Sequence, residues 1–375
     1  RTGFAHFFEH LLFEGTKNIE RGTWMKLVSS RGGNNNANTS QDRTYYYEVF
    51  PSNQLEFGLW MESERMLHPV IDQVGVDTQN EVVKEEKRLR MDNSPYGQIL
   101  KSWGKTYLKC TVQGPEHRVH GRLDAATLEE FIAYKEKYYG PNNAVLVVAG
   151  DIDIEKTKSM IEQYFGPVPT GQNVVRNFPE EEPITQEVRA KAYDPNIQIP
   201  ATIVAYRTPG FASREAYVLD MISTYLSDGK TSKLYKKMVD EQKQALQIGA
   251  FNLGQEDYGM YLIFGLPVGE NTLETLNTEI EEEIAAVRNE LIADKDFQKI
   301  QNKFENDFVN ANSSVEGIAG SLATYYMLYG DTSLINKQID IYRSITREEI
   351  QQVAQQYLQP NQRVVIDYLP QSAKQ

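Results

Sequence analysis

The sequence contains almost no cysteine: Cys110 is the only one among 375 residues. A single cysteine excludes a disulfide within the chain and a zinc site built from several thiolates. The cysteine content therefore gives no information about the compartment, and we expect Cys110 to be a small core residue.

Long hydrophobic runs and an excess of basic residues are also missing. The apolar stretch Ala144–Ala149 is far shorter than the roughly 20 residues that span a bilayer, so we expect no membrane span. The net charge of -13 argues against nucleic acid as a partner, because phosphate binding needs a basic surface. It is compatible with neutral or cationic partners, or simply with solubility.

The length and composition indicate a globular protein with two domains, each large enough for its own core. Hydrophobic residues make up 40% of the 375 positions and charged residues 24%. The first residue is Arg1 rather than Met, and no signal peptide can be identified before the first motif. We therefore expect either a processed chain or a truncated sequence.

An internal repeat organises the chain. Thr127–Gly150 and Thr346–Leu369 each begin with a Thr cap and two carboxylates, continue through an amphipathic helix, and stop at a Pro-containing turn. Both are predicted to end in a Val-rich buried strand. The two segments are separated by a constant 219 positions.

A weaker match pairs Phe13–Thr16 with Ser227–Lys230 at the end of an earlier helix in each half. The strand predicted at Ala201–Tyr206 precedes that helix in the second half, whereas almost no residues precede it in the first. We therefore expect the opening strands of the first copy to be missing before Arg1.

The boundary between the copies is predicted in Phe165–Pro183, which is rich in Pro, Gly and carboxylates and has no hydrophobic period. This gives a first domain at 1–168, a linker at 169–185 and a second domain at 186–375. Mixed helices and strands in each predict an α+β fold. The predicted helices are Asn53–His68, Gln79–Met91, Thr272–Ile292 and Asp296–Leu328, and the predicted hairpin is Leu246–Leu253 with Tyr258–Pro267.

The most informative motif is H-F-F-E-H, which contains His6, Glu9 and His10. On a helix, positions four apart lie one turn above each other, so both imidazoles can reach one zinc ion. Glu9 lies on the same side and could take a proton from zinc-bound water. The alternative is a surface cluster arising by chance. Apolar residues surround the trio and predict a buried helix in which polar groups need partners: Phe4, Phe7, Phe8, Leu11, Leu12 and Phe13.

A third ligand is expected from the segment Gln79–Asn93. Its helical phase places Glu86 on one face with Val82, Val83 and Leu89, and Gln79 lies on that face two turns earlier. Glu85 instead falls on a charged face with Glu81, Arg88 and Asp92. We therefore predict Glu86, and not Glu85, as the ligand.

With these residues in place, the sequence resembles the M16 (pitrilysin and insulinase) family of inverted zinc metallopeptidases, especially its bacterial and mitochondrial-processing branch. The family has H-x-x-E-H followed by Glu about 76 residues later, and Glu86 stands 76 positions after His10. The resemblance covers essentially the whole chain. It implies two homologous α/β-sandwich domains of the LuxS/metallohydrolase type, one Zn2+ per chain, His6, His10 and Glu86 as ligands, and Glu9 as general base.

A second landmark is the stretch Gly32–Thr39, which is similar to the family pattern G-G-x-x-N-A-x-T. The resemblance implies an edge strand to which an extended peptide adds, with Asn36, Ala37 and Thr39 binding substrate and Asn36 holding a substrate carbonyl. Free backbone groups on such a strand would capture a peptide with little regard to its side chains. The alternative for this Asn-rich stretch is a polar loop.

Two positions depart from the family pattern. Gln79 stands where the family often has a second Glu that supports the site, so one charge near the metal is lost. Val239 and Leu246 stand where single-chain members carry an Arg and a Tyr that stabilise the substrate carbonyl.

Together these features predict a zinc metalloendopeptidase with a zinc-bound water activated by Glu9, and the resemblance implies that its substrates are unfolded peptides. The second domain lacks metal ligands. A homologous M16-like partner is expected to supply the missing Arg and Tyr in a heterodimer, with a homodimer or monomer as alternatives. The rival functions are an inactive structural subunit and a peptide-binding subunit of a larger complex. Resemblance to bacterial members favours the periplasm.

Overall fold

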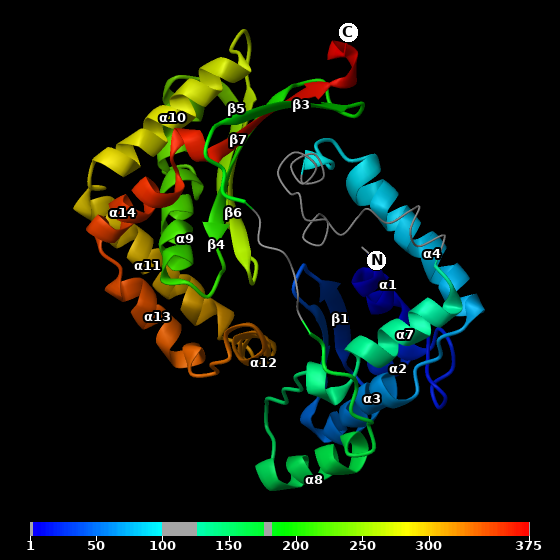
Figure 1. Cartoon of the computed structure of the whole chain (residues 1–375). Helices are drawn as coiled ribbons and strands as arrows, with labels where there is room; N and C mark the ends of the chain where they lie inside the picture. Colours follow the sequence, from blue (N-terminus) through cyan, green and yellow to red (C-terminus); the bar gives the residue numbers. More distant parts are fainter. Residues whose placement is uncertain (1–2, 100–125, 176–181, 375) are drawn as a thin grey trace. The chain divides into compact units, whose positions relative to one another are not determined.

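The computed structural model describes residues 3–99, 126–175 and 182–374 (Figure 1). They form two compact units. The first unit comprises the described residues within 1–92, 110–179 and 314–323, and the second those within 93–109, 180–313 and 324–375. Cys110 and part of the predicted linker, 176–181, lie outside the described residues.

The second unit contains a sheet of five strands in the order β3-β7-β4-β6-β5. β3 pairs with β7 in parallel, and the other neighbours are antiparallel. β5 and β6 form the hairpin predicted from the sequence. The strands are β3 (Val188–Asp194), β4 (Ala201–Pro209), β5 (Ala245–Leu253), β6 (Tyr258–Pro267) and β7 (Arg363–Pro370).

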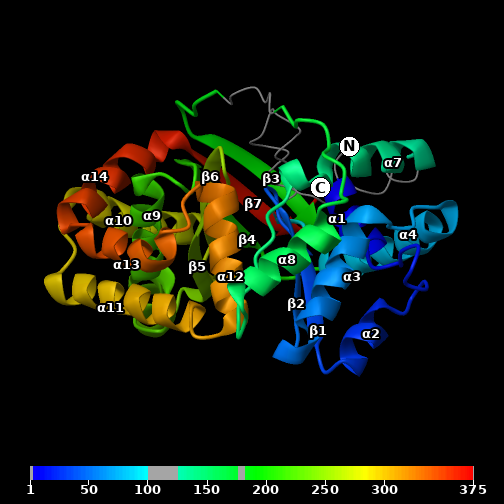
Figure 2. The same ribbon diagram turned by 90° about the horizontal axis from the view of Figure 1, so that it is seen from below.

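Helices cover one face of this sheet, as Figures 1 and 2 show. Their apolar faces and the sheet form one buried core, while the opposite sheet face has a smaller apolar cluster. The helices are α9 (Arg214–Ser227), α10 (Leu273–Asn289), α11 (Asp294–Ala311), α13 (Leu334–Ser344) and α14 (Arg347–Tyr357), with π-helical turns at Tyr235–Glu241 and Tyr325–Tyr329.

The prediction of one continuous helix over Asp296–Leu328 is wrong. α11 ends at Ala311, and α12 (Val315–Thr324), which belongs to the first unit, begins after a break. The break follows from the local sequence, because the Ser314 hydroxyl accepts a hydrogen bond from the Gly317 N–H and so caps a new helix.

The first unit has a two-stranded antiparallel ladder and a set of helices around it. The strands are β1 (Asn34–Thr39) and β2 (Thr44–Val49). The helices are α1 (Phe4–Leu11), α2 (Trp24–Ser30), α3 (Leu55–Leu67), α4 (Gln73–Lys87) with a π-helical turn at Arg88–Asp92, α7 (Leu128–Tyr138) and α8 (Ile154–Phe165).

The two copies of the repeat have the same helix start and the same turn. Thr127 caps α7 and Thr346 caps α14, each through a capping box with the Glu three residues later. Each helix is followed by a 3-10 turn, at Pro141–Asn143 and Pro360–Gln362.

The predicted strands that follow these turns differ. β7 forms a buried strand with β3 and β4 on its two sides. The corresponding prediction for Ala144–Ala149 is wrong: these residues form no strand, and Leu146 is exposed. In the described part of the first unit β1 and β2 pair with each other, and neither pairs with this stretch.

A buried arginine of α3 fixes the C-terminal end of α1. The Arg65 guanidinium donates to the Leu12 carbonyl at 2.9 Å and pairs with Glu62 at 2.9 Å. Three aromatic rings surround it, with their centroids 4.1–4.6 Å from the guanidinium carbon: Phe13, Trp24 and Tyr46. Because such a charge is costly to bury without partners, this cluster locks α1 against α3 and β2.

Glu48 of β2 is the second carboxylate beside Arg65. Its ionisation is expected to make the stability depend on pH. Burial raises the pKa of Glu48 to about 8, with Glu62 adding to the shift and Arg65 and the Trp24 N–H opposing it. The folded protein therefore retains a proton that the unfolded chain loses near the ordinary value of 4.5. The stabilisation that comes from keeping Glu48 protonated is complete below pH 4.5 and is lost as the pH rises towards 8.

We expect Glu48→Gln, which cannot ionise, to remove this dependence. Between pH 5 and pH 9 the wild type should lose about 2–4 kcal/mol of unfolding free energy relative to the variant, measured in urea at both pH values. The exposed Glu85→Gln change is the matched control and should follow the wild type. Parallel pH curves for wild type and Glu48→Gln would contradict the assignment.

Candidate metal centre and peptide-binding strand

α1 is oriented by its apolar face. Phe4, Phe7 and Phe8 are at most 4% exposed. The Phe131 ring of α7 stacks on Phe4 and packs at a tilt against Phe7, with both centroid distances 4.8 Å. This confirms the predicted burial of the helix. Because the aromatic face is fixed against α7, the face with His6, Glu9 and His10 is turned away from it.

α4 brings Glu86 to α1. Val83 is buried in the same core, and the Gln79 amide donates to the Glu14 carboxylate, so this side of α4 faces α1. The prediction that Val82 and Leu89 lie on the buried face is wrong, because Val82 is 41% exposed and Leu89 is 62% exposed. α4 ends at Lys87, and the wider π-helical turn that follows changes the phase of Leu89.

In the described part of the chain, Gln79 and Glu85 lie outside the cluster of His6, His10 and Glu86. Gln79 instead joins a chain of polar contacts in which Arg21 bridges Glu14 and Asp72. Glu85 is exposed and pairs with Arg88. Gln79 therefore supports the packing of α4 on the end of α1.

The side chains of His6, His10 and Glu86 form a compact triangle. The two histidine Nε2 atoms lie 3.3 Å apart, and Glu86 Oε2 lies 3.4 Å from His6 Nε2 and 3.6 Å from His10 Nε2. Within the described ranges this is the one His, Cys, Asp or Glu cluster of metal-binding geometry.

These distances fit a tetrahedral ion. Zinc bonds of about 2.0–2.1 Å at tetrahedral angles place neighbouring ligand atoms roughly 3.3–3.4 Å apart. Glu86 Oε2 is buried and has no hydrogen-bond partner among the residues that the structure describes. A cation held between the two imidazoles would satisfy this oxygen, so the donor set fits zinc.

Glu9 lies beside the triangle and accepts a hydrogen bond from Thr39. The Thr39 hydroxyl donates to Glu9 Oε2 at 2.7 Å. Burial raises the pKa of Glu9, while the Thr39 bond and the neighbouring His10 oppose the shift. A half-buried carboxylate with one oxygen engaged is suited to accept a proton on the other.

β1 is an edge strand, and its register identifies its free backbone groups. Among the described residues it pairs with β2 alone, and the Ser40 N–H donates to the Arg43 carbonyl at the hairpin end. Hydrogen-bonded and non-hydrogen-bonded pairs alternate in an antiparallel ladder. The backbone groups of Asn35, Ala37 and Thr39 therefore face away from β2, towards the free edge.

Asn36 has a different position from the other predicted substrate-binding residues. Its backbone faces β2, and its side-chain Oδ1 accepts the Ala37 N–H at 2.9 Å. The Asn36 side chain thus accepts from the Ala37 N–H, a donor that an added peptide strand would use. Sequence reasoning did not identify this contact, nor the one between Thr39 and Glu9.

Val239 and Leu246 offer no polar side chain, as the sequence indicated. Val239 packs on the core of the second unit, and Leu246 is 54% exposed on β5.

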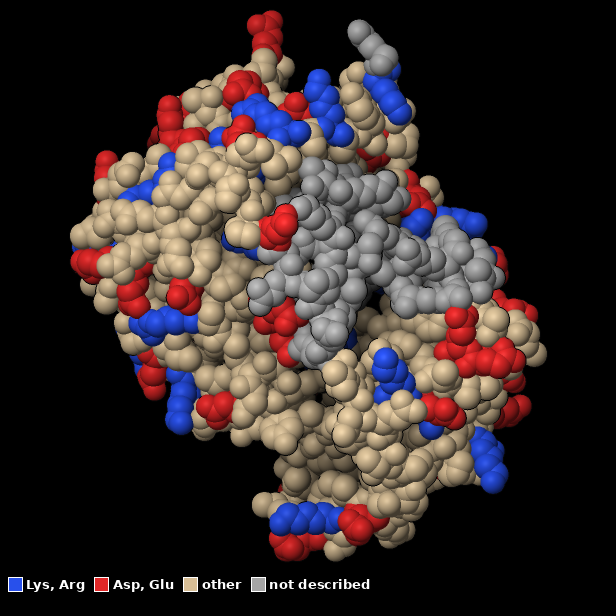
Figure 3. All heavy atoms as spheres, in the orientation of Figure 1, with Lys and Arg blue, Asp and Glu red and all other residues tan. Residues whose placement is uncertain are grey.

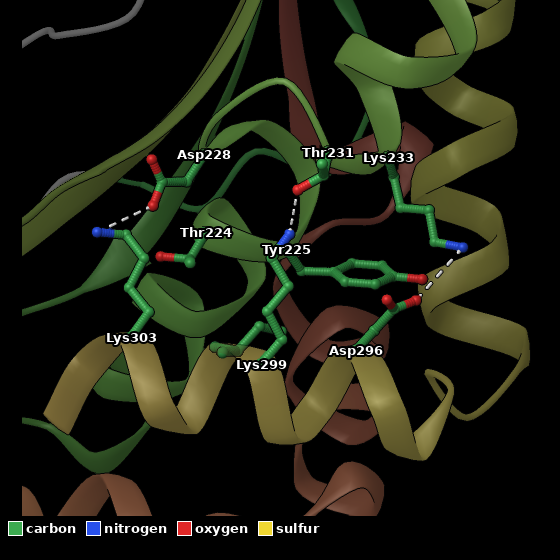
Figure 4. A pocket seen from close by; sticks show the side chains of 9 residues that line it. Thr224, Tyr225, Asp228, Thr231, Lys233, Asp296, Lys299 and Lys303 are labelled. Atoms are coloured by element: carbon green, nitrogen blue, oxygen red, sulfur yellow. Dashed lines mark hydrogen bonds and ion pairs between the residues drawn. The ribbon is translucent and has the colours of Figure 1, made fainter. Parts of the chain in front are cut away.

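A separate concavity lies in the second unit between the end of α9 and α11 (Figure 4). Lys303 pairs with Asp228 at 3.1 Å, Lys233 lies 3.7 Å from Asp296, and the Lys299 ammonium donates to the Thr231 hydroxyl. Carboxylates are interspersed with these lysines. We therefore interpret the residues that line the concavity as a polar network that fastens α11 to the segment after α9.

Charged side chains of both signs are mixed on the surface. On the face in Figure 3, Lys and Arg side chains lie among Asp and Glu rather than in one basic patch. Of the described helices, none is long and apolar enough to cross a membrane.

Family models match two stretches of the chain. Residues 1–98 match "Insulinase (Peptidase family M16)", and residues 125–304 match "Peptidase M16 inactive domain". The candidate residues His6, Glu9, His10 and Glu86 all lie within the first match.

Individual proteins show the same relationship. The zinc protease PqqE of Helicobacter pylori is 26% identical, with 99% of this chain and 84% of that protein covered. A solved protease structure from Helicobacter pylori has a TM-score of 0.92 at 24% identity and covers 98% of this chain and 89% of its own. The mitochondrial-processing peptidase subunit beta of Blastocladiella emersonii is 24% identical over 70% of this chain and 57% of that protein.

The fold and these matches define the class as a mixed helix-and-sheet protein with a peptidase fold. The chain belongs to the M16 peptidase family.

Proposed function

We propose that the chain is a zinc-dependent endopeptidase that hydrolyses unfolded peptides in extended form. The observation that carries this proposal is the triangle of His6, His10 and Glu86 with Glu9 beside it. Zinc in such a site acidifies a water molecule and polarises the scissile carbonyl.

The side chains then have distinct roles. His6, His10 and Glu86 hold the ion. Glu9 takes the proton from the attacking water and delivers it to the leaving amine, as a general base followed by a general acid.

The substrate class follows from the free edge of β1. The outward backbone groups of Asn35, Ala37 and Thr39 can pair with the backbone of an added strand. Only an extended segment can add in this way, so unfolded peptides are favoured and the side-chain preference is weak.

Two rival functions belong to other classes: an inactive structural subunit and a peptide-binding subunit that does not cut. The match to the inactive-domain model covers residues 125–304 and leaves the metal cluster outside it. A structural subunit would have no need for a partly buried carboxylate beside two imidazoles, so the cluster favours the enzyme.

A quenched fluorescent peptide separates the three functions. The zinc-loaded chain, with its partner subunit if one is required, should cleave it, a chelator should stop cleavage, and added zinc should restore it. A peptide-binding subunit would bind the peptide without cleaving it, and a structural subunit would do neither. Cleavage that survives complete removal of metal would contradict the proposal.

The missing Arg and Tyr predict a partner. A fixed oxyanion donor commonly contributes about 2.7–4 kcal/mol to catalysis, and Val239 and Leu246 cannot donate. We propose that a homologous M16-like subunit provides these groups in a heterodimer. The relative from Blastocladiella emersonii is itself named as one subunit of a peptidase.

We expect the isolated chain to bind zinc but to hydrolyse peptides slowly, and the partner to raise kcat by about 100-fold or more without changing the metal content. The measurement is a titration of the zinc-loaded chain with the partner subunit. Full turnover without a partner would show that the donors lie elsewhere in this sequence.

A further inference from the structure

Thr39 is placed to act on two parts of the site at once. It ends β1, its backbone groups lie on the free edge, and its hydroxyl points to α1. The contact with Glu9 joins residues 30 positions apart in the sequence. The backbone of Thr39 thus lies on the edge of β1 that is proposed to bind the peptide, while its side chain contacts Glu9.

The hydroxyl has one proton to donate, and the ionised Glu9 is the strongest acceptor near it. The second hydroxyl nearby, Thr44 Oγ1, lies 3.3 Å from Thr39 Oγ1. The two residues form a non-hydrogen-bonded pair of the ladder, in which side chains lie closest together. The rotamer of Thr39 is therefore restricted from the β2 side, and its hydroxyl holds one carboxylate oxygen of Glu9 in place.

We propose that Thr39 is a positioning residue that sets Glu9 relative to a peptide on the free edge of β1. This inference rests on the proposed peptidase function. A peptide bond beside Thr39 is then held by the same residue that orients the base. Without the hydroxyl, the flexible Glu9 side chain would sample several rotamers. A misplacement of about 1 Å can cost on the order of 100-fold in rate.

The test compares Thr39→Val with Thr39→Ser in the zinc-loaded protein, together with its partner subunit if one is required. Valine keeps the branched shape but removes the hydroxyl, whereas serine keeps the hydroxyl. We expect Thr39→Val to lower kcat by about 10–100-fold with KM within about twofold of wild type and with unchanged zinc content. Thr39→Ser should recover most of kcat.

Thr44→Val is the matched control, because it removes the neighbouring hydroxyl of the same hairpin, 3.3 Å from Thr39 Oγ1, and leaves the hydrogen bond from Thr39 to Glu9 in place. It should lower kcat much less than Thr39→Val. Thermal unfolding of all three variants checks that the hairpin is intact.

The outcomes are distinct. Wild-type protein that shows no zinc-dependent cleavage overturns the proposed function and this inference with it. Cleavage by the wild type with an unchanged kcat in Thr39→Val overturns the inference alone. A raised KM at unchanged kcat also overturns it, because Thr39 would then be a substrate-binding residue only.

Discussion

Glu9→Gln is expected to abolish peptide hydrolysis while zinc remains bound. Glutamine preserves the shape of the side chain and still accepts the Thr39 hydrogen bond, but it cannot take a proton from water. We expect kcat to fall by about 100-fold or more, since general-base catalysis contributes typically 10²–10⁴. KM should change little, because the backbone edge of β1 is untouched.

The measurement pairs a peptide assay with metal analysis of the same sample. Zinc must be present at the wild-type level for the result to bear on Glu9. Wild-type kcat in a zinc-replete Glu9→Gln protein would show that another group is the base.

The second large effect concerns zinc affinity. Glu86→Gln should weaken zinc binding severely, because the amide replaces the carboxylate oxygen that lies 3.4 and 3.6 Å from the two histidine Nε2 atoms. Loss of an outer-shell partner commonly costs 10–100-fold in affinity or activity, so loss of a direct ligand should cost more than about 100-fold.

Glu85→Gln provides the control from the neighbouring position. Glu85 is exposed and pairs with Arg88. The Glu85→Gln change should therefore leave zinc affinity within about twofold of wild type. Competition with a chromophoric chelator measures both variants. A loss of affinity in Glu85→Gln, with wild-type binding in Glu86→Gln, would require a different ligand set.

The sequence was informative where a local pattern determines the structure. The apolar residues around His6 predicted a buried α1, and the capped starts at Thr127 and Thr346 predicted two matching helices, because capping and helical periodicity involve neighbours in the chain. The proximity of Glu86 to His6 and His10 was also expected, although Val82 and Leu89 do not share the buried side that the phase argument assumed.

Features that depend on distant partners could not be predicted. The apolar run at Ala144–Ala149 resembles β7, but a strand also needs neighbours, and hydrophobicity alone does not specify them. The Thr39 bond to Glu9 depends on how β1 meets α1. The sequence shows a charged residue at Arg65 in an otherwise ordinary helix, and only the tertiary structure reveals the aromatic rings around it.

The central claim is that one zinc ion, held by His6, His10 and Glu86, makes this chain a peptidase. The most direct test is to add zinc in measured equivalents to metal-free protein, with its partner subunit if one is required, and to follow peptide hydrolysis. The account predicts a rate that starts near zero, rises linearly, and stops rising at one zinc per chain. A rate that is already complete without zinc, or no hydrolysis at any zinc level with and without the partner, would contradict it.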